Sequence, residues 1–228
     1  MVVPEGGSTY FFNMTHIVDG HTGIEHAIPV APLYKDAVTL FAKSQSGYTP
    51  TLIVGYGGIW GENYWYQHTN VWENERLMRF TPRGVIDERA RRRLMVPEND
   101  FYHFDLGKSV KDVLHAGGKV QLGAHGQLQG QGAHWELWML QQGGLTPLEA
   151  IRCGTLYGAQ YLGFDKDIGS LEVGKLADLM IMDKNPLENI QNTSSISYVM
   201  VNGVLYSTNN MDEVYPEAKA RAKFFWER

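Results

Sequence analysis

The chain has 228 residues, 43% of them hydrophobic and 20% charged, so it can bury the core of a globular protein. Its net charge of −5 leaves no basic footprint, which argues against nucleic acid as the main partner. The single cysteine, Cys153, excludes an internal disulfide framework and a cysteine-based zinc site. No apolar run reaches the about 18 residues of a membrane span, and the first residues do not resemble a signal peptide. We therefore expect a cytoplasmic protein by default.

Short β-rich segments alternate with helical patterns in the first part of the chain. Strands are expected at residues 1–5, 23–26 and 48–54, each followed by a loop that contains glycine or proline. Apolar residues at helical spacing predict a helix over residues 33–44, and a weaker pattern predicts one over residues 13–19. The first strand begins at residue 1 without a cap, which is typical of a fragment of a larger protein.

Aromatic residues crowd a long segment between the third and fourth expected strands, residues 59–101. Trp60, Trp65 and Trp72 lie there beside two tyrosines, and an arginine run follows. Packing against the rest of the protein is the favoured interpretation because buried aromatic area is mostly core. The alternative is that the segment from Trp60 to Trp72 walls a substrate pocket.

The stretch KVQLGAHGQLQGQGAHWE, residues 119–136, predicts a buried strand, a glycine-rich loop and the start of a helix. His125, His134 and Glu136 lie at the strand end and the helix entry. Loops at the carboxyl ends of parallel strands converge on one mouth, which is where α/β proteins place their chemistry. On these residues alone, a plain turn with surface histidines is the alternative.

The second half of the chain continues with helical patterns and ends in β-rich segments. A helix is expected over residues 106–116, and Thr146-Pro-Leu-Glu149 is the start of another that runs to about residue 162. Three strands are then expected, at residues 178–182, 197–201 and 204–206, and the signal Asn202-Gly203 predicts a hairpin turn between the last two. A charged helix is expected after them, over residues 215–226.

Four strand–helix units in a row predict an α/β fold with a parallel sheet and right-handed crossovers. Four units make half of a (β/α)8 TIM-type barrel, to which the last strands add a small C-terminal β appendix. We expect a half-barrel domain over residues 1–163 and a domain of C-terminal strands and a final helix over residues 164–228. A half-barrel leaves sheet edges bare, so we also expect a homodimer or a higher symmetric oligomer.

The phrase DIGSLEVGKLADLMIMDKNP, residues 167–186, resembles the C-terminal signature of the amidohydrolase superfamily, in the branch related to imidazolonepropionase and prolidase. The preceding LTPLEAIRCGTLYGAQYLG is similar to the last barrel helices of that family, and together the two motifs cover about residues 143–206. DGHTGIEHAIP and HWEL look like a subgroup found in large propeller-plus-amidohydrolase proteins. The resemblance implies that the four expected strands are barrel strands five to eight.

The resemblance also implies a metal site, because the family holds one or two divalent ions at the ends of its barrel strands. Glu5 stands where the strand-five histidine is expected, His26 matches the strand-six histidine, and His125 replaces the usual strand-eight aspartate. Two imidazoles and a carboxylate suit a divalent metal, with zinc as the expected ion. The histidine pair of the family's strand one is not in this chain.

The function that follows is a metal-dependent hydrolase acting on amide, ester or phosphotriester bonds of small molecules through metal-activated water. The candidates for the catalytic base are Glu136, His134 and Glu25, in that order. Slow and promiscuous esterase or phosphotriesterase activity is expected because the aspartate and half of the metal shell are missing. The alternative is a non-catalytic C-terminal fragment or assembly module of a larger amidohydrolase.

Overall fold

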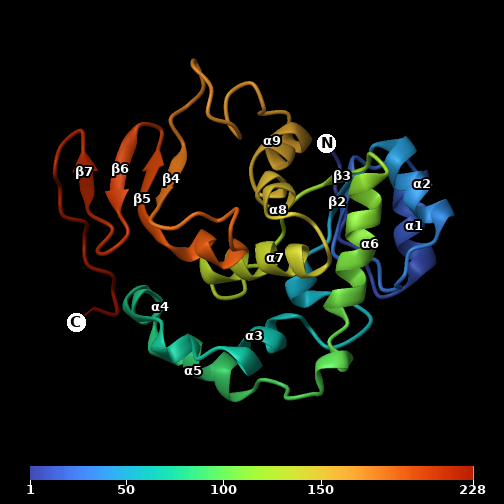
Figure 1. Cartoon of the computed structure of the whole chain (residues 1–228), viewed down its shortest axis with the longest axis horizontal. Coiled ribbons are helices and arrows are strands. Elements are labelled where there is room, and N and C mark those ends of the chain that lie inside the picture. Colours follow the sequence, from blue (N-terminus) through green and yellow to red (C-terminus); the bar gives the residue numbers. More distant parts are fainter. Residues whose placement is uncertain (228) are drawn as a thin grey trace.

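The computed structural model describes residues 1–227 and contains two sheets of different kinds (Figure 1). The first is a parallel sheet with the order β1-β2-β3, formed by Gly23–Glu25, Gly47–Thr49 and Lys119–Val120. Glu5 adds a parallel bridge to Glu25 at the β1 edge. Each of the four strand segments expected in this part of the chain therefore contributes to one parallel arrangement, with shorter pairing than the sequence pattern predicts.

The helices that flank this sheet agree with the predicted ones in type and approximate bounds. They are α1 (Tyr10–Val18), α2 (Lys35–Ser44), α6 (His103–His115), α7 (Gln131–Gln142), α8 (Pro147–Cys153) and α9 (Leu156–Leu162). At the start of α8, Thr146 and Glu149 form the expected capping box: the Glu149 N–H donates to Thr146 Oγ1 at 3.3 Å, and the Thr146 N–H donates to Glu149 Oε2 at 2.8 Å. The single helix predicted from this cap is instead two short ones, separated at Gly154 and Thr155.

Two glycines allow α6 and α7 to approach closely. A Cβ added at Gly143 would lie 2.4 Å from the backbone carbon of Gly107, closer than real Cβ atoms come. Gly143 follows the last residue of α7, and Gly107 lies inside α6. This contact fixes α7, and with it the loop that enters α7 from β3, against the helix that precedes β3.

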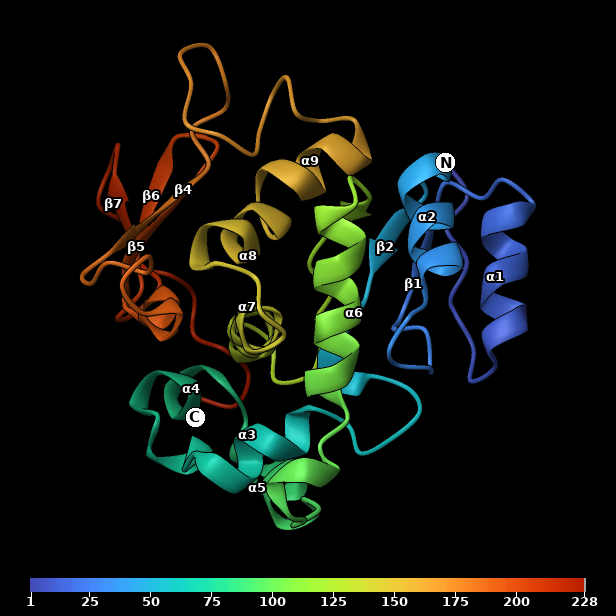
Figure 2. The same cartoon turned by 45° about the vertical axis from the view of Figure 1, so that its right-hand side comes forward.

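The aromatic segment forms a helical excursion at the lower edge of the molecule in Figures 1 and 2. Its elements are α3 (Glu62–His68), η2 (Val71–Glu73), α4 (Glu75–Phe80), α5 (Arg83–Arg91) and η3 (Glu98–Asp100). Trp65 is buried and packs on Trp135 and Trp138 of α7, with ring centroids 6.3 and 5.0 Å apart. The packing interpretation is therefore correct for Trp65, whereas Trp60 and Trp72 are partly exposed.

The second sheet is antiparallel, with the order β4-β5-β6-β7, and lies at the left of Figure 1. Its strands are Leu179–Met182, Ile196–Val201, Val204–Ser207 and Glu213–Tyr215, and η4 (Ile190–Ser194) precedes β5. The predicted hairpin joins β5 to β6, with φ of +48° at Asn202 and +81° at Gly203. Two positive φ angles are what this turn needs, and asparagine and glycine adopt them most readily.

The helix predicted over residues 215–226 is wrong. Tyr215 ends β7, and the residues from 216 to 227 contain no helix. The backbone N–H of Lys219 donates to the Glu213 carbonyl at 3.0 Å and the reverse bond is also 3.0 Å, so Lys219 pairs with the sheet. This pairing uses the backbone groups that a helix through Lys219 would need, which local helix propensity does not reveal. Both views place the end of the chain beside α4 (Figures 1 and 2).

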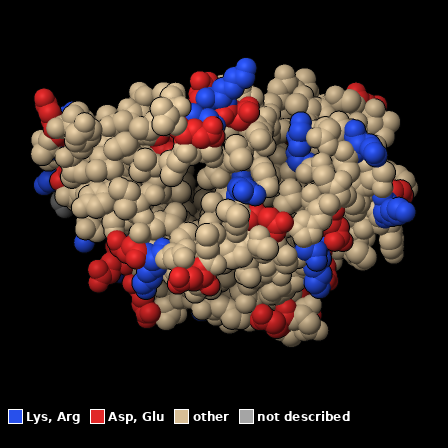
Figure 3. Space-filling view, turned by 45° about the horizontal axis from the view of Figure 1, so that its top comes forward, with Lys and Arg blue, Asp and Glu red and all other residues tan. Residues whose placement is uncertain are grey.

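Among residues 1–227, no helix is both long and apolar enough to cross a membrane. On the face shown in Figure 3, acidic and basic side chains are interspersed, and the surface over β4–β7 at the left is largely uncharged. Exposed apolar side chains in this sheet include Met180, Ile181 and Val201. The two sheets thus differ in surface as well as in topology.

Candidate metal centre

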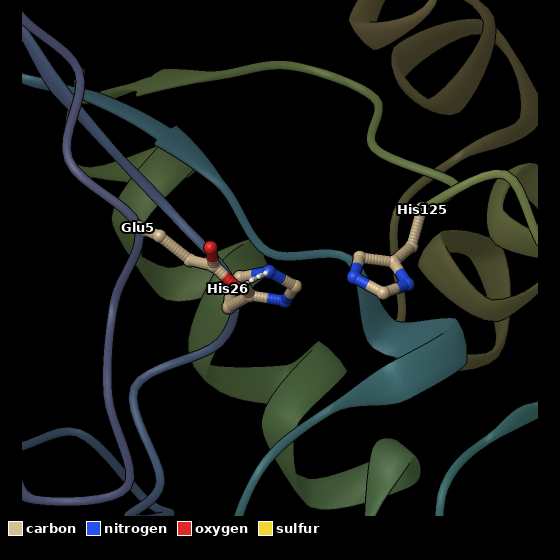
Figure 4. Close-up of side chains that lie close together, drawn as sticks. All are labelled: Glu5, His26 and His125. Atoms are coloured by element: carbon tan, nitrogen blue, oxygen red, sulfur yellow. Dashed lines mark ion pairs between the residues drawn. The ribbon is translucent and has the colours of Figure 1, made fainter.

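Glu5, His26 and His125 lie together at one edge of the parallel sheet (Figure 4). One ligand atom from each residue lies within 4.8 Å of the other two. Glu5 Oε1 is 3.1 Å from His26 Nε2, and the rings of His26 and His125 have centroids 5.1 Å apart. The carboxyl ends of parallel strands meet at one edge, so residues distant in sequence converge there.

Each of these side chains follows a strand segment directly or through a short loop. Glu5 makes the bridge to β1, His26 is the residue after β1, and His125 lies in the loop between β3 and α7. The resemblance of the sequence to the amidohydrolase superfamily predicts these three as ligands, and the structure brings all three to one place.

The backbone around this cluster is strained. His26 and His125 have φ of +71° and +52°, and Thr51, at the start of η1 (Leu52–Val54), has φ of +49°. Residues other than glycine rarely adopt these angles, because the Cβ atom crowds the backbone. Such strain concentrates at functional sites, where the surrounding structure holds it in place. All three residues line the same hollow.

His26 is suited to bind a metal as a neutral imidazole. Its side chain is 6% exposed. Burial lowers its pKa, and the neighbouring His125 lowers it further, while Glu5 opposes both effects. A neutral ring keeps a lone pair for coordination at neutral pH. Its Nδ1 is buried with no hydrogen-bond partner among residues 1–227.

The cluster lines a hollow of about 410 Å³ that also receives Glu25, Thr49 and Thr51. Thr49 Oγ1 donates to Glu25 Oε1 at 3.0 Å and accepts from Gln121 Nε2 at 2.9 Å. Burial raises the pKa of Glu25, and the hydrogen bond from Thr49 opposes this. Of the three predicted base candidates, Glu25 is the one that lines this hollow.

Glu136 lies elsewhere, fully buried in α7. Its two carboxyl oxygens accept the backbone N–H groups of Leu52 and Ile53 at 2.7 and 2.9 Å. Burial raises its pKa to about 8, against the opposing effect of these two donors. Glu136 therefore connects α7 to η1, whose first residue, Leu52, follows the strained Thr51. It does not line the hollow.

His134 also lies outside the hollow and contacts Thr193, with Nδ1 3.1 Å from Thr193 Oγ1. Burial, assisted by the charge of Arg76, lowers its pKa to about 4. Trp60 and Trp72 do not line the hollow either, so the predicted aromatic wall is not found there.

Two residues that support the site from β2 and its extension are not among the predicted site residues. Thr49 and Thr51 flank Pro50, where the sequence pattern predicts a continuous strand through residue 54. A proline near a strand's end marks a break in pairing, and this signal could have placed the two hydroxyls at the sheet edge. Tyr56 is not among the predicted site residues either, although its ring centroid is 5.1 Å from that of His26.

Comparison with known proteins gives a match of residues 108–206 to the model of the amidohydrolase family. The predicted resemblance to the amidohydrolase superfamily is confirmed. A 5'-deoxyadenosine deaminase of Methanobrevibacter smithii is 37% identical over 83 residues, which are 36% of this chain and 18% of the deaminase. Ochratoxinase of Aspergillus niger is 30% identical over 103 residues, or 43% of this chain and 22% of ochratoxinase.

The structural comparison extends the resemblance to most of the chain. The crystal structure of a Xaa-Pro dipeptidase aligns with a TM-score of 0.62 and 23% identity, over 90% of this chain and 44% of the dipeptidase. An α/β fold that resembles amidohydrolase structures is thereby confirmed. The chain spans less than half the length of these relatives.

Proposed function

We propose that this chain contributes a divalent metal centre, with Glu5, His26 and His125 as ligands, to a hydrolase of the amidohydrolase type. The observation that carries the proposal is the convergence of these three side chains, with one ligand atom each within 4.8 Å of the others. The left-handed backbone of both histidines is independent support, since strain of this kind marks functional sites.

The donor set fits a metal ion such as zinc. Two imidazoles and a carboxylate are a ligand combination that catalytic zinc sites use, with a fourth position left open. The ion, when bound, would lower the pKa of water and polarise the substrate's carbonyl or phosphoryl oxygen. Divalent metals are general in the amidohydrolase superfamily, which this chain resembles, and this supports a divalent ion at the cluster.

We assign the role of proton acceptor to Glu25. Its carboxyl group lines the hollow with the three ligands, and Thr49 holds one of its oxygens. A general base must lie within reach of the water from which it takes a proton, and Glu25 meets this condition better than His134 or Glu136. Thr49 would orient the carboxylate, and Gln121 would in turn orient Thr49.

Amide, ester and phosphotriester bonds of small molecules are the proposed substrates. The hollow of about 410 Å³ is the size of a small-molecule site. Two of the similar proteins are a deaminase and a Xaa-Pro dipeptidase, names that describe reactions at carbon–nitrogen bonds. This favours amides within the proposed substrate range.

The test is hydrolysis of p-nitrophenyl esters, amino-acyl p-nitroanilides and aryl dialkyl phosphates by zinc-loaded, chelator-treated and reloaded protein. We expect slow turnover by the zinc-loaded protein. Chelation should abolish this turnover, added zinc should restore it, and the His125→Asn variant should lack it. Activity that survives both chelation and this substitution would contradict the proposal. Tight metal binding without turnover of any substrate would favour the assembly-module alternative.

The parallel sheet is further proposed to be half of a (β/α)8 barrel, occupying residues 1–163, with a separate C-terminal unit from residue 164. Parallel strands in chain order support this, as does alignment with 44% of the dipeptidase. Bare sheet edges and the exposed apolar side chains Met180 and Ile181 favour a homodimer or a higher symmetric oligomer. Light scattering that gives the mass of a dimer or a larger oligomer would support the assembly, and a monomer mass at all concentrations would contradict it.

A further inference from the structure

A second and larger cleft lies away from the metal centre, between the helical excursion and the antiparallel sheet. Its volume is about 1440 Å³. Its walls come from α4 and α5, from the loop that enters α7, from β5 and β6, and from the tail after β7. These parts are distant in sequence, and the tail lies beside α4 in both ribbon views (Figures 1 and 2).

Four arginines line the cleft, and two of them have no carboxylate partner among residues 1–227. Arg89 pairs with Glu62 at 3.4 Å, and Arg221 pairs with Glu227 through both of its terminal nitrogens. Arg79 donates to a neutral backbone carbonyl, that of Asn209.

Arg76 has neither a hydrogen-bond acceptor nor an ion-pair partner within the described part of the chain, and it is half-buried. A partly buried guanidinium without a counter-charge is unfavourable, so an anion bound nearby would be stabilised. The charge of Arg76 also acts on His134 across the same cleft.

The rest of the lining contains one carboxylate, that of the exposed Glu75, and is otherwise largely apolar and aromatic. Phe80 and Phe224 contact each other edge to face, with ring centroids 6.3 Å apart, and Phe224 stacks on Trp226 with ring centroids 4.5 Å apart. Ile196 and Val199 of β5 add aliphatic surface. Trp226 also lines the cleft, and its Nε1 is buried with no acceptor among residues 1–227.

His134 supplies a hydrogen-bond acceptor to the cleft, in contrast to the arginine donors. The Thr193 hydroxyl gives its hydrogen to the Ile190 carbonyl at 2.8 Å, so its oxygen accepts from Trp138 Nε1 at 3.0 Å and from His134 Nδ1 at 3.1 Å. The hydrogen of the neutral ring is therefore on Nδ1, and Nε2 is left as an acceptor on the cleft that His134 lines.

We propose that this cleft binds an organic anion with an aromatic or branched apolar body and an N–H or O–H donor. Arg76 and Arg79 would hold the carboxylate, sulfonate or phosphate group, the phenylalanine pair would cover the apolar body, and His134 would accept from the donor. The assignment does not depend on the metal centre, which lies in a different hollow.

The test compares two fluorescent probes that share one apolar body: 8-anilino-1-naphthalenesulfonate, which carries the anion, and N-phenyl-1-naphthylamine, which lacks it. Arg76→Gln should weaken binding of the sulfonate about tenfold, the usual size of a charge-assisted hydrogen bond. Binding of the neutral probe should not change. Phe224→Ala should weaken both probes, because it removes a wall that they share.

Arg92→Gln is the matched control, because it removes one exposed arginine that does not line the cleft and should leave both affinities unchanged. Arg79→Gln repeats the test at a second position if Arg76→Gln lowers the melting temperature. The proposal would be overturned if the arginine variants lost affinity for both probes equally or bound the sulfonate with unchanged affinity. It would also be overturned if the native protein showed no saturable binding of the sulfonate.

Discussion

Replacing His26 by asparagine should weaken zinc binding by at least about 100-fold, since even residues that only support a ligand change affinity by 10–100-fold. The reason is geometric as well as chemical. His26 Nε2 lies 3.1 Å from Glu5 Oε1, so its loss removes a ligand and the partner that holds Glu5 in place. Asparagine is the better variant than alanine, because it tolerates the left-handed φ of +71° at this position.

Zinc affinity is measured by competition with a chromogenic chelator, with circular dichroism as the check on folding. His21→Asn is the matched control: this histidine lies five residues earlier in the chain and contacts the His16 carbonyl instead of the cluster. The His21→Asn variant should bind zinc with the same affinity as the native protein. Equal zinc affinity in His26→Asn and the native protein would contradict the ligand assignment.

Glu136→Ala should destabilise the fold by about 4 kcal/mol, since it leaves two buried N–H groups without acceptors and opens a cavity. The groups are those of Leu52 and Ile53, which Glu136 reaches from α7. Urea unfolding measures the loss. Glu88→Gln, an exposed carboxylate on α5, is the control and should change stability by less than about 0.5 kcal/mol.

The stability contribution of Glu136 should depend on pH. Its pKa is about 8 in the folded protein and 4.5 in the absence of burial, so the folded state holds its proton over a wider range. Stability should therefore fall as the pH rises from about 4.5 to 8, and Glu136→Gln should flatten this dependence. A stable but inactive Glu136→Gln protein would instead support the catalytic role that the sequence predicts.

The sequence predicts that Glu5, His26 and His125 lie close together, and the structure shows this proximity, because each of the three follows a segment with its own local signal. Glu5, His26 and His125 come after short β-rich runs, and parallel strands bring such positions together whatever the intervening chain does. The hairpin at Asn202-Gly203 is predictable for the same reason, since two adjacent residues determine its geometry.

Features that depend on distant partners could not be read from the sequence. Glu136 contacts Ile53, 83 residues earlier, so nothing near it in the chain distinguishes a buried structural carboxyl group from a catalytic one. The alanine-rich tail around Lys219 has helical propensity, but pairing with Glu213 determines its conformation. Thr51 has a positive φ that neighbouring elements impose, and no local signal gives that angle.

Anomalous diffraction at the zinc absorption edge, on crystals of zinc-loaded protein, tests the central claim most directly. We predict one strong peak in contact with a Glu5 oxygen and with one ring nitrogen each of His26 and His125, at about 2.0–2.2 Å. A peak bound by other residues, or no peak at this cluster in fully loaded protein, would contradict the metal centre.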